Sequence, residues 1–170
     1  MIRKATSADC HDLAALHVLT WQQAYSNLMP QAFLDGLTLE LETRSELWSN
    51  AIEERTASVF LDYDDDTLVG FAACGKCQDS DAKTTWGELG ALYYLKPYWG
   101  TGRAQILYLE ALGQLKENGN SVATLWVLDG NSRAIAFYQK RGFRFDEQEK
   151  VEKKPEFAIR ELRMTKQLVS

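Results

Sequence analysis

The sequence has 170 residues, of which 45% are hydrophobic and 25% charged, and this composition is typical of one folded domain with one core. The net charge of −5 argues against a general nucleic-acid-binding protein, which normally carries a basic face, and weakly favours a cationic partner such as an amine. The sequence lacks both the apolar run of about 18 residues that a transmembrane helix needs and the apolar core of a signal peptide. We therefore expect a cytoplasmic protein that binds no membrane.

The pattern of apolar residues predicts regular elements along the whole chain, without a linker or repeat, so we expect a single domain over residues 1–170. In chain order, the expected elements are a strand at 2–6, a helix that follows Thr6 and includes 13–24, a helical region over 30–54 that breaks near Gly36, strands at 58–62, 67–74 and 86–95, a helix over 103–118, a strand at 122–128, a helix over 132–141, and strands at 143–151 and 157–168. This order predicts an α/β (α+β) fold, in which a mixed sheet carries helices on both faces.

The loop Trp99-Gly100-Thr101-Gly102 joins a predicted strand to the clearest helix of the sequence, which begins at Arg103. Glycines allow the backbone to approach a bulky anion closely, and the start of a helix offers several unpaired N–H groups and a partial positive charge. Together these features predict a phosphate site made by the backbone. The alternative is a tight turn that binds nothing. The loop matches neither the Walker sequence nor the dinucleotide glycine pattern.

A second segment, residues 125–143, is a strand followed by a loop with Asn131 and a short helix that carries Tyr138. Taken alone, Asn131 is a good residue for the N-terminal cap of a helix, and Tyr138 is expected to pack half-buried.

The two segments, in this order and spacing, resemble two motifs of the GNAT superfamily of N-acetyltransferases. The first is similar to the acetyl-CoA motif Gln/Arg-x-x-Gly-x-Gly/Ala, although Trp99 replaces the usual Gln or Arg and Arg103 occupies an often aliphatic position. The second matches the element Asn-x-x-Ala-x-x-Phe-Tyr-x-x-x-Gly-Phe at Asn131, Ala134, Phe137, Tyr138, Gly142 and Phe143. The resemblance implies one domain with a mostly antiparallel sheet of six to seven strands and helices on both faces.

The resemblance also implies acetyl-CoA as co-substrate, with no metal, and assigns roles to residues. The backbone of Leu92 and Tyr94 would pair with the pantetheine arm, and the Tyr94 N–H would polarise the thioester carbonyl. Tyr138 would protonate the departing CoA thiolate as a general acid. The remaining cofactor contacts are expected from Asn131 and Arg133 and, for the pyrophosphate, from the loop Trp99, Gly100, Thr101, Gly102, Arg103 and Ala104.

Glu88 is the candidate general base that would take a proton from the attacking amine, directly or through a water. The alternation of side chains along a strand predicts that it shares a face with Leu92 and Tyr94. The alternative is that Glu88 only orders a neighbour on the next strand. Trp21 and Tyr25, four residues apart on the first helix, would line the acceptor pocket or pack in the core.

The implied function is transfer of an acetyl group to a primary amine of a small molecule or peptide, by direct attack in a ternary complex. A homodimer is a further expectation from the family. One alternative is a CoA-binding sensor or scaffold without turnover, although such a protein needs neither Glu88 nor Tyr138. Another is a redox or zinc module at Cys74 and Cys77, but the sequence shows no second pair of ligands, so we interpret this segment as the frayed end of a strand.

Overall fold

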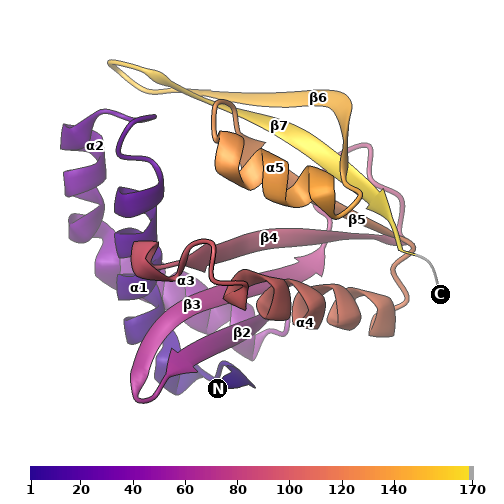
Figure 1. The fold of residues 1–170 in the computed structure, drawn as a ribbon, viewed down its shortest axis with the longest axis horizontal. Coiled ribbons are helices and arrows are strands. Elements are labelled where there is room, and N and C mark those ends of the chain that lie inside the picture. Colours follow the sequence, from indigo (N-terminus) through magenta and orange to yellow (C-terminus); the bar gives the residue numbers. More distant parts are fainter. Residues whose placement is uncertain (169–170) are drawn as a thin grey trace.

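The computed structural model describes residues 1–168, which form one seven-stranded mixed sheet with helices on both faces (Figure 1). The predicted fold class is therefore confirmed. The strands lie in the order β1-β2-β3-β4-β5-β7-β6, and within residues 1–168 only β4 and β5 pair in parallel. Their bounds are β1 (Ile2–Lys4), β2 (Ala57–Asp64), β3 (Thr67–Lys76), β4 (Trp86–Tyr94), β5 (Val122–Leu128), β6 (Arg144–Lys153) and β7 (Ala158–Gln167).

The helices agree with the predicted positions, including the break at Gly36. They are α1 (Cys10–Ala24), α2 (Gln31–Gly36), α3 (Leu41–Glu53), α4 (Arg103–Glu117) and α5 (Ser132–Lys140), with 3₁₀ turns at η1 (Ser7–Asp9), η2 (Leu37–Glu40) and η3 (Lys96–Tyr98). The α4 helix ends where Gly119 adopts a positive φ of 81°, a conformation that glycine reaches without strain. None of the helices in the described part of the chain is long and apolar enough to cross a membrane.

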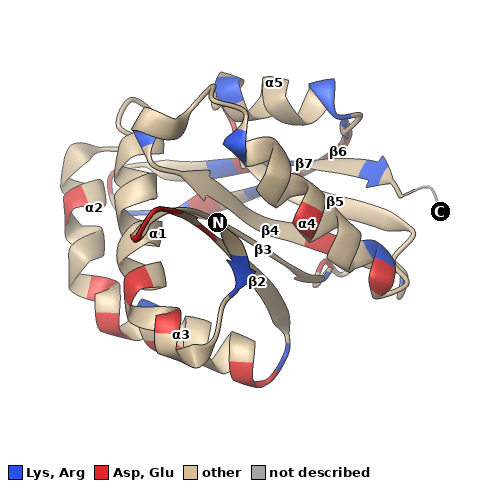
Figure 2. Cartoon of the chain, turned by 60° about the horizontal axis from the view of Figure 1, so that its bottom comes forward, with Lys and Arg blue, Asp and Glu red and all other residues tan. Residues whose placement is uncertain are grey.

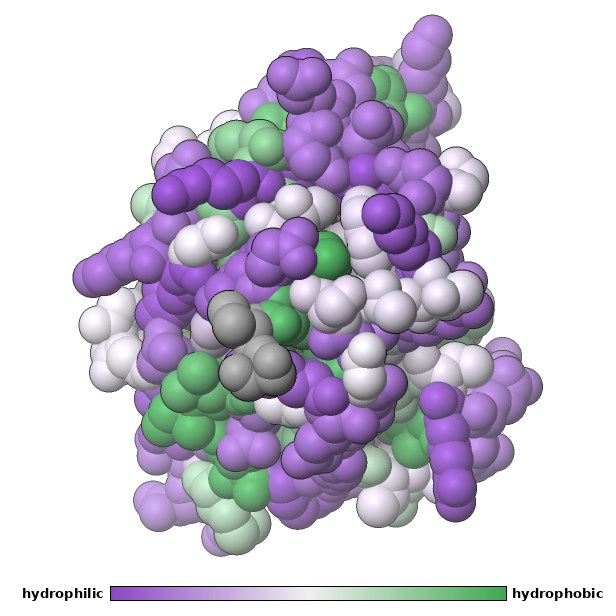
Figure 3. Space-filling model, turned by 90° about the vertical axis from the view of Figure 1, so that its right-hand side faces the viewer, coloured by the Kyte–Doolittle hydropathy of each residue, from purple (hydrophilic) through white to green (hydrophobic). Residues whose placement is uncertain are grey.

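Each face of the sheet is covered by its own set of helices (Figures 1 and 2). On one face, Leu107 of α4 packs with Leu125 of β5 and with Phe143, which follows α5, and all three are fully buried. On the other face, Leu13 of α1 packs with Phe71 of β3. Acidic residues gather on the outer surface of α3 and of the 3₁₀ turn before it (Figure 2). The face in Figure 3 is mostly hydrophilic, with its apolar residues in small groups.

One prediction about β3 is wrong. The expected strand ended at Cys74 and frayed there, whereas β3 continues through Lys76, because its pairing with β2 continues to Gly75 and its pairing with β4 to Lys76. Cys74 and Cys77 are both buried free thiols. Cys74 lies in the core beneath α4, while the Cys77 sulfur contacts Asp79 and Thr124. The segment is therefore an ordered part of the sheet.

The pairing between β4 and β5 is short, and the gap where it stops is the candidate site. The two strands pair only from Trp86↔Val122 to Glu88↔Thr124, so they are not hydrogen-bonded to each other beyond that point. On its other side, β4 shifts register against β3, with Ala73 opposite Ala91 and Cys74 opposite Leu89. Gly90 is thus the extra residue of a β-bulge, which reverses the alternation of side chains along β4.

Two glycine-to-alanine substitutions test the packing between β3 and β4 and the surface of α4. A Cβ added at Gly70 would clash with the Tyr94 ring, so we expect Gly70→Ala to destabilise the protein by about 1–3 kcal/mol, as overpacking does. Gly113, inside α4, has nothing within 4 Å of an added Cβ, so Gly113→Ala should stabilise by about 0.5–1 kcal/mol. Urea unfolding measures both changes. Unchanged stability of Gly70→Ala would mean that the Tyr94 ring is not fixed against β3.

Candidate functional site

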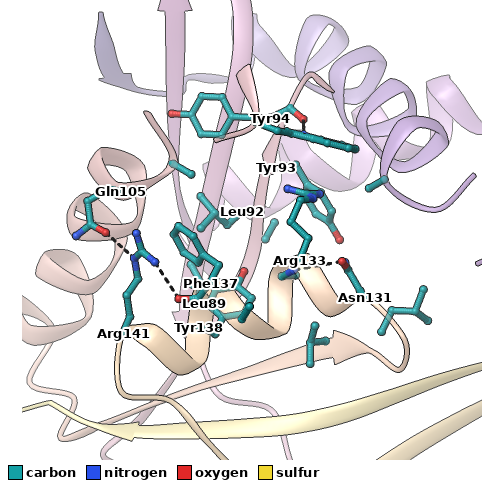
Figure 4. Close-up of a pocket in the computed structure, with 18 of the residues that line it drawn as sticks. Leu89, Leu92, Tyr93, Tyr94, Gln105, Asn131, Arg133, Phe137, Tyr138 and Arg141 are labelled. Atoms are coloured by element: carbon teal, nitrogen blue, oxygen red, sulfur yellow. Dashed lines mark hydrogen bonds between the residues drawn. The ribbon is translucent and has the colours of Figure 1, made fainter. Parts of the chain in front are cut away.

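A cavity of about 510 Å³ lies in the gap between β4 and β5, and its lining comes from both faces of the sheet (Figure 4). The α4–α5 face contributes the loop before α4, the first turn of α4 and one side of α5. The opposite face contributes Ala24 and Tyr25 of α1, together with Tyr93 of β4 and Trp126 of β5. A ligand can therefore reach the gap from one face while a second molecule approaches it from the other.

The edge of β4 that faces this gap exposes backbone polar groups. The N–H of Leu95 donates to the carbonyl of Val69 in β3, at 3.0 Å. Because backbone groups alternate sides along a strand, those of Leu92 and Tyr94 point away from β3 and toward the gap. The Tyr94 carbonyl accepts a hydrogen bond from Trp99 Nε1, at 2.8 Å. The Leu92 groups and the Tyr94 N–H remain directed at the cavity, as the expected pairing with an extended ligand requires.

The loop between β4 and α4 presents backbone N–H groups to the cavity. Gly100 and Gly102 have positive φ angles of 74° and 90°, and an added Cβ at either position would meet nothing within 4 Å. Within residues 1–168, the N–H groups of Gly100, Gly102, Arg103 and Ala104 have no hydrogen-bond partner, while that of Gln105 donates to the Gly102 carbonyl at 3.1 Å. Unpaired donors at the start of a fifteen-residue helix are the groups with which a helix N-terminus can accept an anion.

Two side chains of this loop, those of Thr101 and Arg103, do not point into the cavity. The Thr101 hydroxyl donates to the Tyr98 carbonyl at 2.7 Å. The Arg103 guanidinium turns away from the cavity and binds Asp62 and Asp64. Neither Thr101 nor Arg103 lines the cavity, so each offers the site only its backbone.

The α5 wall of the cavity carries positive charge. Arg133, Lys140 and Arg141 line it, and no Asp or Glu of the described residues does. The Arg133 guanidinium lies 3.7 Å from the centre of the Trp99 ring, and burial lowers the Arg133 pKa. Arg141 donates to the Phe137 carbonyl at 2.9 Å (Figure 4). A desolvated guanidinium without a carboxylate partner favours an anionic ligand.

Asn131 and Tyr138 occupy the two ends of α5. The Asn131 side-chain oxygen accepts a hydrogen bond from the Ala134 N–H at 3.3 Å, so the predicted N-terminal cap is confirmed. Tyr138 lines the cavity with its side chain about nine-tenths buried, and its ring packs against Phe143. Its hydroxyl has no hydrogen-bond partner among residues 1–168, and burial raises its pKa well above the usual value of a tyrosine.

The face predicted for Glu88 is wrong. Leu89, Leu92 and Tyr94 pack together on the α4–α5 face, because the bulge at Gly90 reverses the alternation, and Glu88 therefore lies on the opposite face. Glu88 Oε1 is 4.0 Å from an added Cβ at Gly90, which places the carboxylate beside a residue that lines the cavity. Burial raises the pKa of Glu88, and the negative charges of Asp79 and Glu161 add to this effect.

The acceptor side also contains residues that the sequence analysis did not select. The Tyr25 hydroxyl hydrogen-bonds that of Tyr93 at 2.8 Å, and both rings line the cavity. Burial raises the pKa values of Tyr25 and Tyr93, and the negative charge of Glu161 adds to this effect in both. Trp21 does not line the cavity, and its Nε1 is buried without a partner among the described residues. Tyr93 and Glu161, which the sequence analysis missed, belong to no motif, and only the faces of their strands mark them.

Cys77, Asp79 and Glu88 place their ligand-type atoms within 4.8 Å of one another. The two Asp79 oxygens, however, are paired with Lys150 and Arg163, each at 3.1 Å. These cations already neutralise the carboxylate that a metal would need, so we interpret the group as part of an ion-pair network. Cys74 lies on the other side of the sheet and cannot join it.

Comparisons with known proteins agree with this architecture. Residues 13–143 match the model described as the acetyltransferase (GNAT) family. The chain is 29% identical over 139 residues to the N-acetyltransferase YuaI of Bacillus subtilis strain 168, covering 81% of this chain and 76% of that protein. It is 25% identical over 149 residues to a spermidine N(1)-acetyltransferase of Thermoplasma acidophilum, covering 86% and 89%. The crystal structure of PaiA N-acetyltransferase from the same organism, in complex with coenzyme A, shares the fold with a TM-score of 0.79 at 21% identity, covering 99% of this chain and 98% of that one.

His17 supplies a testable pH dependence next to the acceptor side. It packs against Tyr93, accepts a hydrogen bond from Trp48 Nε1 at 3.3 Å, and has a pKa lowered to about 3 by burial and by the charge of Arg44. An unfolded histidine titrates near pH 6.5. The stability that neutral His17 contributes is therefore present above about pH 6.5 and is lost as the pH falls toward 3, by roughly 1.4 kcal/mol for each pH unit.

We expect the free energy of unfolding in urea to fall more between pH 7.5 and 4.5 for the native chain than for His17→Gln, by about 3 kcal/mol. Comparing the two proteins cancels the contribution of the carboxylates that both contain. Parallel pH profiles for the two proteins would show that His17 titrates normally in the folded chain.

Proposed function

The chain belongs to the acetyltransferase (GNAT) family, and we propose that it transfers the acetyl group of acetyl-CoA to a primary amine of a small molecule or peptide, by direct attack in a ternary complex. The observation that carries this proposal is the charge of the cavity. A chain with a net charge of −5 lines it with three cationic side chains and, among residues 1–168, with no carboxylate. Such a site favours a polyanion, and the pyrophosphate of CoA is one. A cytoplasmic location and a homodimer stay predictions.

The cavity suits the two chemically different parts of the cofactor. The unpaired N–H groups from Gly100 to Ala104 would hold the pyrophosphate, with Arg133 as a nearby cation stacked on Trp99. The amide-rich pantetheine arm would pair with the edge of β4 at Leu92 and Tyr94, as an added strand does. Asn131 would hydrogen-bond this arm. Acetyl-CoA supplies the thioester, which would then lie in the gap between β4 and β5.

The acid and the base approach this gap from opposite faces. Tyr138 lines the α5 side, and its raised pKa keeps the hydroxyl protonated at neutral pH, so it is available to a departing thiolate. Glu88 lies on the acceptor side, where its raised pKa makes it a stronger base than an exposed carboxylate. Glu88 lies on the face of the sheet opposite the side chains of Leu92 and Tyr94. This position supports a role as general base, because the amine has to attack from the face that CoA does not occupy.

A cationic acceptor fits the residues on this second face. Glu88 and Glu161 are both half-buried, burial raises the pKa of each, and neither has an ion-pair partner within residues 1–168. The rings of Tyr25 and Tyr93 provide adjacent π surfaces. A polyamine such as spermidine, for which the Thermoplasma acidophilum relative is named, has this chemistry.

Cofactor binding is tested by thermal unfolding with CoA. A ligand that binds the folded state raises Tm, so we expect saturating CoA to stabilise the native chain. Gly102→Val should abolish this shift, because a β-branched residue does not adopt a φ of 90° and would place its side chain beside the pyrophosphate. Trp99→Ala should lose less affinity, since it removes only the support of Arg133 and a bond to the Tyr94 carbonyl. The proposal fails if CoA leaves the Tm of the native chain unchanged.

Catalysis is tested with Tyr138→Phe and Glu88→Gln, by following thiol release from acetyl-CoA with an accepted amine from about pH 6 to 9.5. A thiol has a pKa near 8.5, and burial raises the Tyr138 pKa above the usual tyrosine value of about 10, so proton transfer to the thiolate is uphill and Tyr138 should assist the reaction rather than dominate it. We expect Tyr138→Phe to lower kcat by about 100-fold with CoA affinity nearly constant. Glu88→Gln removes the proton acceptor, so its residual rate should rise with pH as more amine is already deprotonated.

Glu161→Gln is the matched comparison for Glu88→Gln, because it removes a carboxylate from the same face. It should raise the KM of a cationic amine while the pH profile keeps its native shape. Native rates and a native pH profile for Glu88→Gln would leave Glu88 a structural role. If Tyr138→Phe also kept the native rate, positioning alone would account for the chemistry. Absence of any thiol release by the native chain would favour a CoA-binding sensor.

A further inference from the structure

The loop that carries the unpaired N–H groups is tied to the end of β2 by a buried carboxylate. Asp62 is only 2% exposed. Its two oxygens accept hydrogen bonds from Arg103 Nε at 2.8 Å and from Arg103 Nη2 at 3.0 Å, which is a bidentate pair. The Tyr94 hydroxyl lies 3.0 Å from the same carboxylate and 3.1 Å from the Arg103 carbonyl. One acidic side chain thus holds both the residue that ends β4 and the first residue of α4.

Further bonds reinforce this connection. Arg103 Nη1 binds Asp64 at 2.9 Å, and Arg103 Nη2 donates to the Tyr63 carbonyl at 2.9 Å. The Tyr98 hydroxyl, from the middle of the loop, donates to Asp64 at 2.9 Å. Although burial alone would raise the pKa of Asp62, its bonds to Arg103 and Tyr94 hold that pKa below the usual value. The carboxylate is therefore charged in the folded chain.

This arrangement has a consequence for a negatively charged ligand. The Asp62 carboxylate binds the side chain of Arg103, whose own N–H belongs to the first turn of α4. Neither Asp62 nor any other carboxylate of the described residues lines the cavity. We propose that Asp62 is a positioning residue for the cofactor: through Arg103 and Tyr94 it fixes the direction of the N–H groups that receive the pyrophosphate. This inference rests on the proposed function and adds to it a residue that does not touch the cofactor.

The proposal is distinguishable from simple electrostatics because the two predict opposite signs. Asp62→Asn removes a negative charge near a polyanionic ligand and releases part of the Arg103 guanidinium. If charge alone mattered, CoA would bind more tightly to this variant. If Asp62 fixes the first turn of α4, CoA binds more weakly in spite of the favourable change in charge.

The test compares Asp62→Asn with Asp66→Asn, which removes the same charge from the exposed turn after β2. Calorimetric titration with CoA should give a Kd about tenfold higher for Asp62→Asn, the scale of loss that a small misplacement of a binding group causes, and close to native for Asp66→Asn. Acetyl-pantetheine, which lacks the pyrophosphate, serves as a second donor. Its kcat/KM should be the same for the native chain and Asp62→Asn, whereas kcat/KM for acetyl-CoA should fall about tenfold.

Arg103→Lys keeps the inference falsifiable if Asp62→Asn does not fold. Its side chain is 26% exposed, and lysine retains the charge but loses the planar fork that binds Asp62 and Asp64 together. We expect a loss of CoA affinity in the same direction, with acetyl-pantetheine again unaffected. A native or lower Kd for CoA in the folded variants overturns the inference. So does an equal loss with both donors, since that indicates a general structural role.

The closing control separates this inference from the proposed function. If the native chain itself does not bind CoA, the proposed function fails, and the positioning role fails with it. If the native chain binds CoA and the variants bind it with the same affinity, the proposed function stands and only the role of Asp62 is rejected.

Discussion

The site depends on the short pairing between β4 and β5, which hydrogen-bond to each other only from Trp86 to Glu88. A sheet that stayed paired along both strands would satisfy every backbone group of β4 and leave no passage between its faces. Since the pairing stops, Leu92 and Tyr94 direct polar backbone groups into the gap, where a ligand with amide groups can satisfy them. The bulge at Gly90 adds a second effect, because it moves Glu88 to the face opposite these residues. The early end of the pairing opens the gap, and the bulge places Glu88 and the edge residues of β4 on the two different faces that a two-substrate reaction needs.

The distribution of charge follows from this geometry. The chain is acidic as a whole, and acidic residues gather on α3 (Figure 2). The wall made by α5 nevertheless carries Arg133, Lys140 and Arg141, and Asp62, a buried carboxylate near the loop, is neutralised by Arg103. The two faces of the sheet therefore differ in sign around a common gap, with cations on the α5 side and Glu88 and Glu161 on the other. A polyanionic donor and a cationic acceptor would each be attracted to the correct face.

The sequence predicted the fold and the position of the glycine loop before α4 well because both depend on local patterns, while the binding of phosphate by this loop stays a prediction. The apolar spacing of α4, the two glycines before it and the cap at Asn131 are each encoded within a few residues. The face of Glu88 was predicted wrongly because alternation holds only in an unbroken ladder, and Gly90, a glycine inside the predicted strand, was an available signal of a bulge. Glu161 and Tyr93 were missed for a related reason. Tyr93 lines the cavity, and Glu161 comes to the same face only through the pairing of distant strands, so no motif includes them.

Two departures from the family motif, Trp99 and Arg103, become understandable once the backbone is seen as the recognition element. If N–H groups receive the anion, as we propose, the side chains of the loop are free to take other tasks. Trp99 supports the Arg133 guanidinium and binds the Tyr94 carbonyl, and Arg103 anchors the first turn of α4 to β2. Backbone recognition, however, requires a backbone that does not move, since N–H groups cannot rotate independently to follow a ligand. An aliphatic residue at position 103 would leave that rigidity to packing alone, whereas the pair of Arg103 and Asp62 supplies it by directional hydrogen bonds from two strands away.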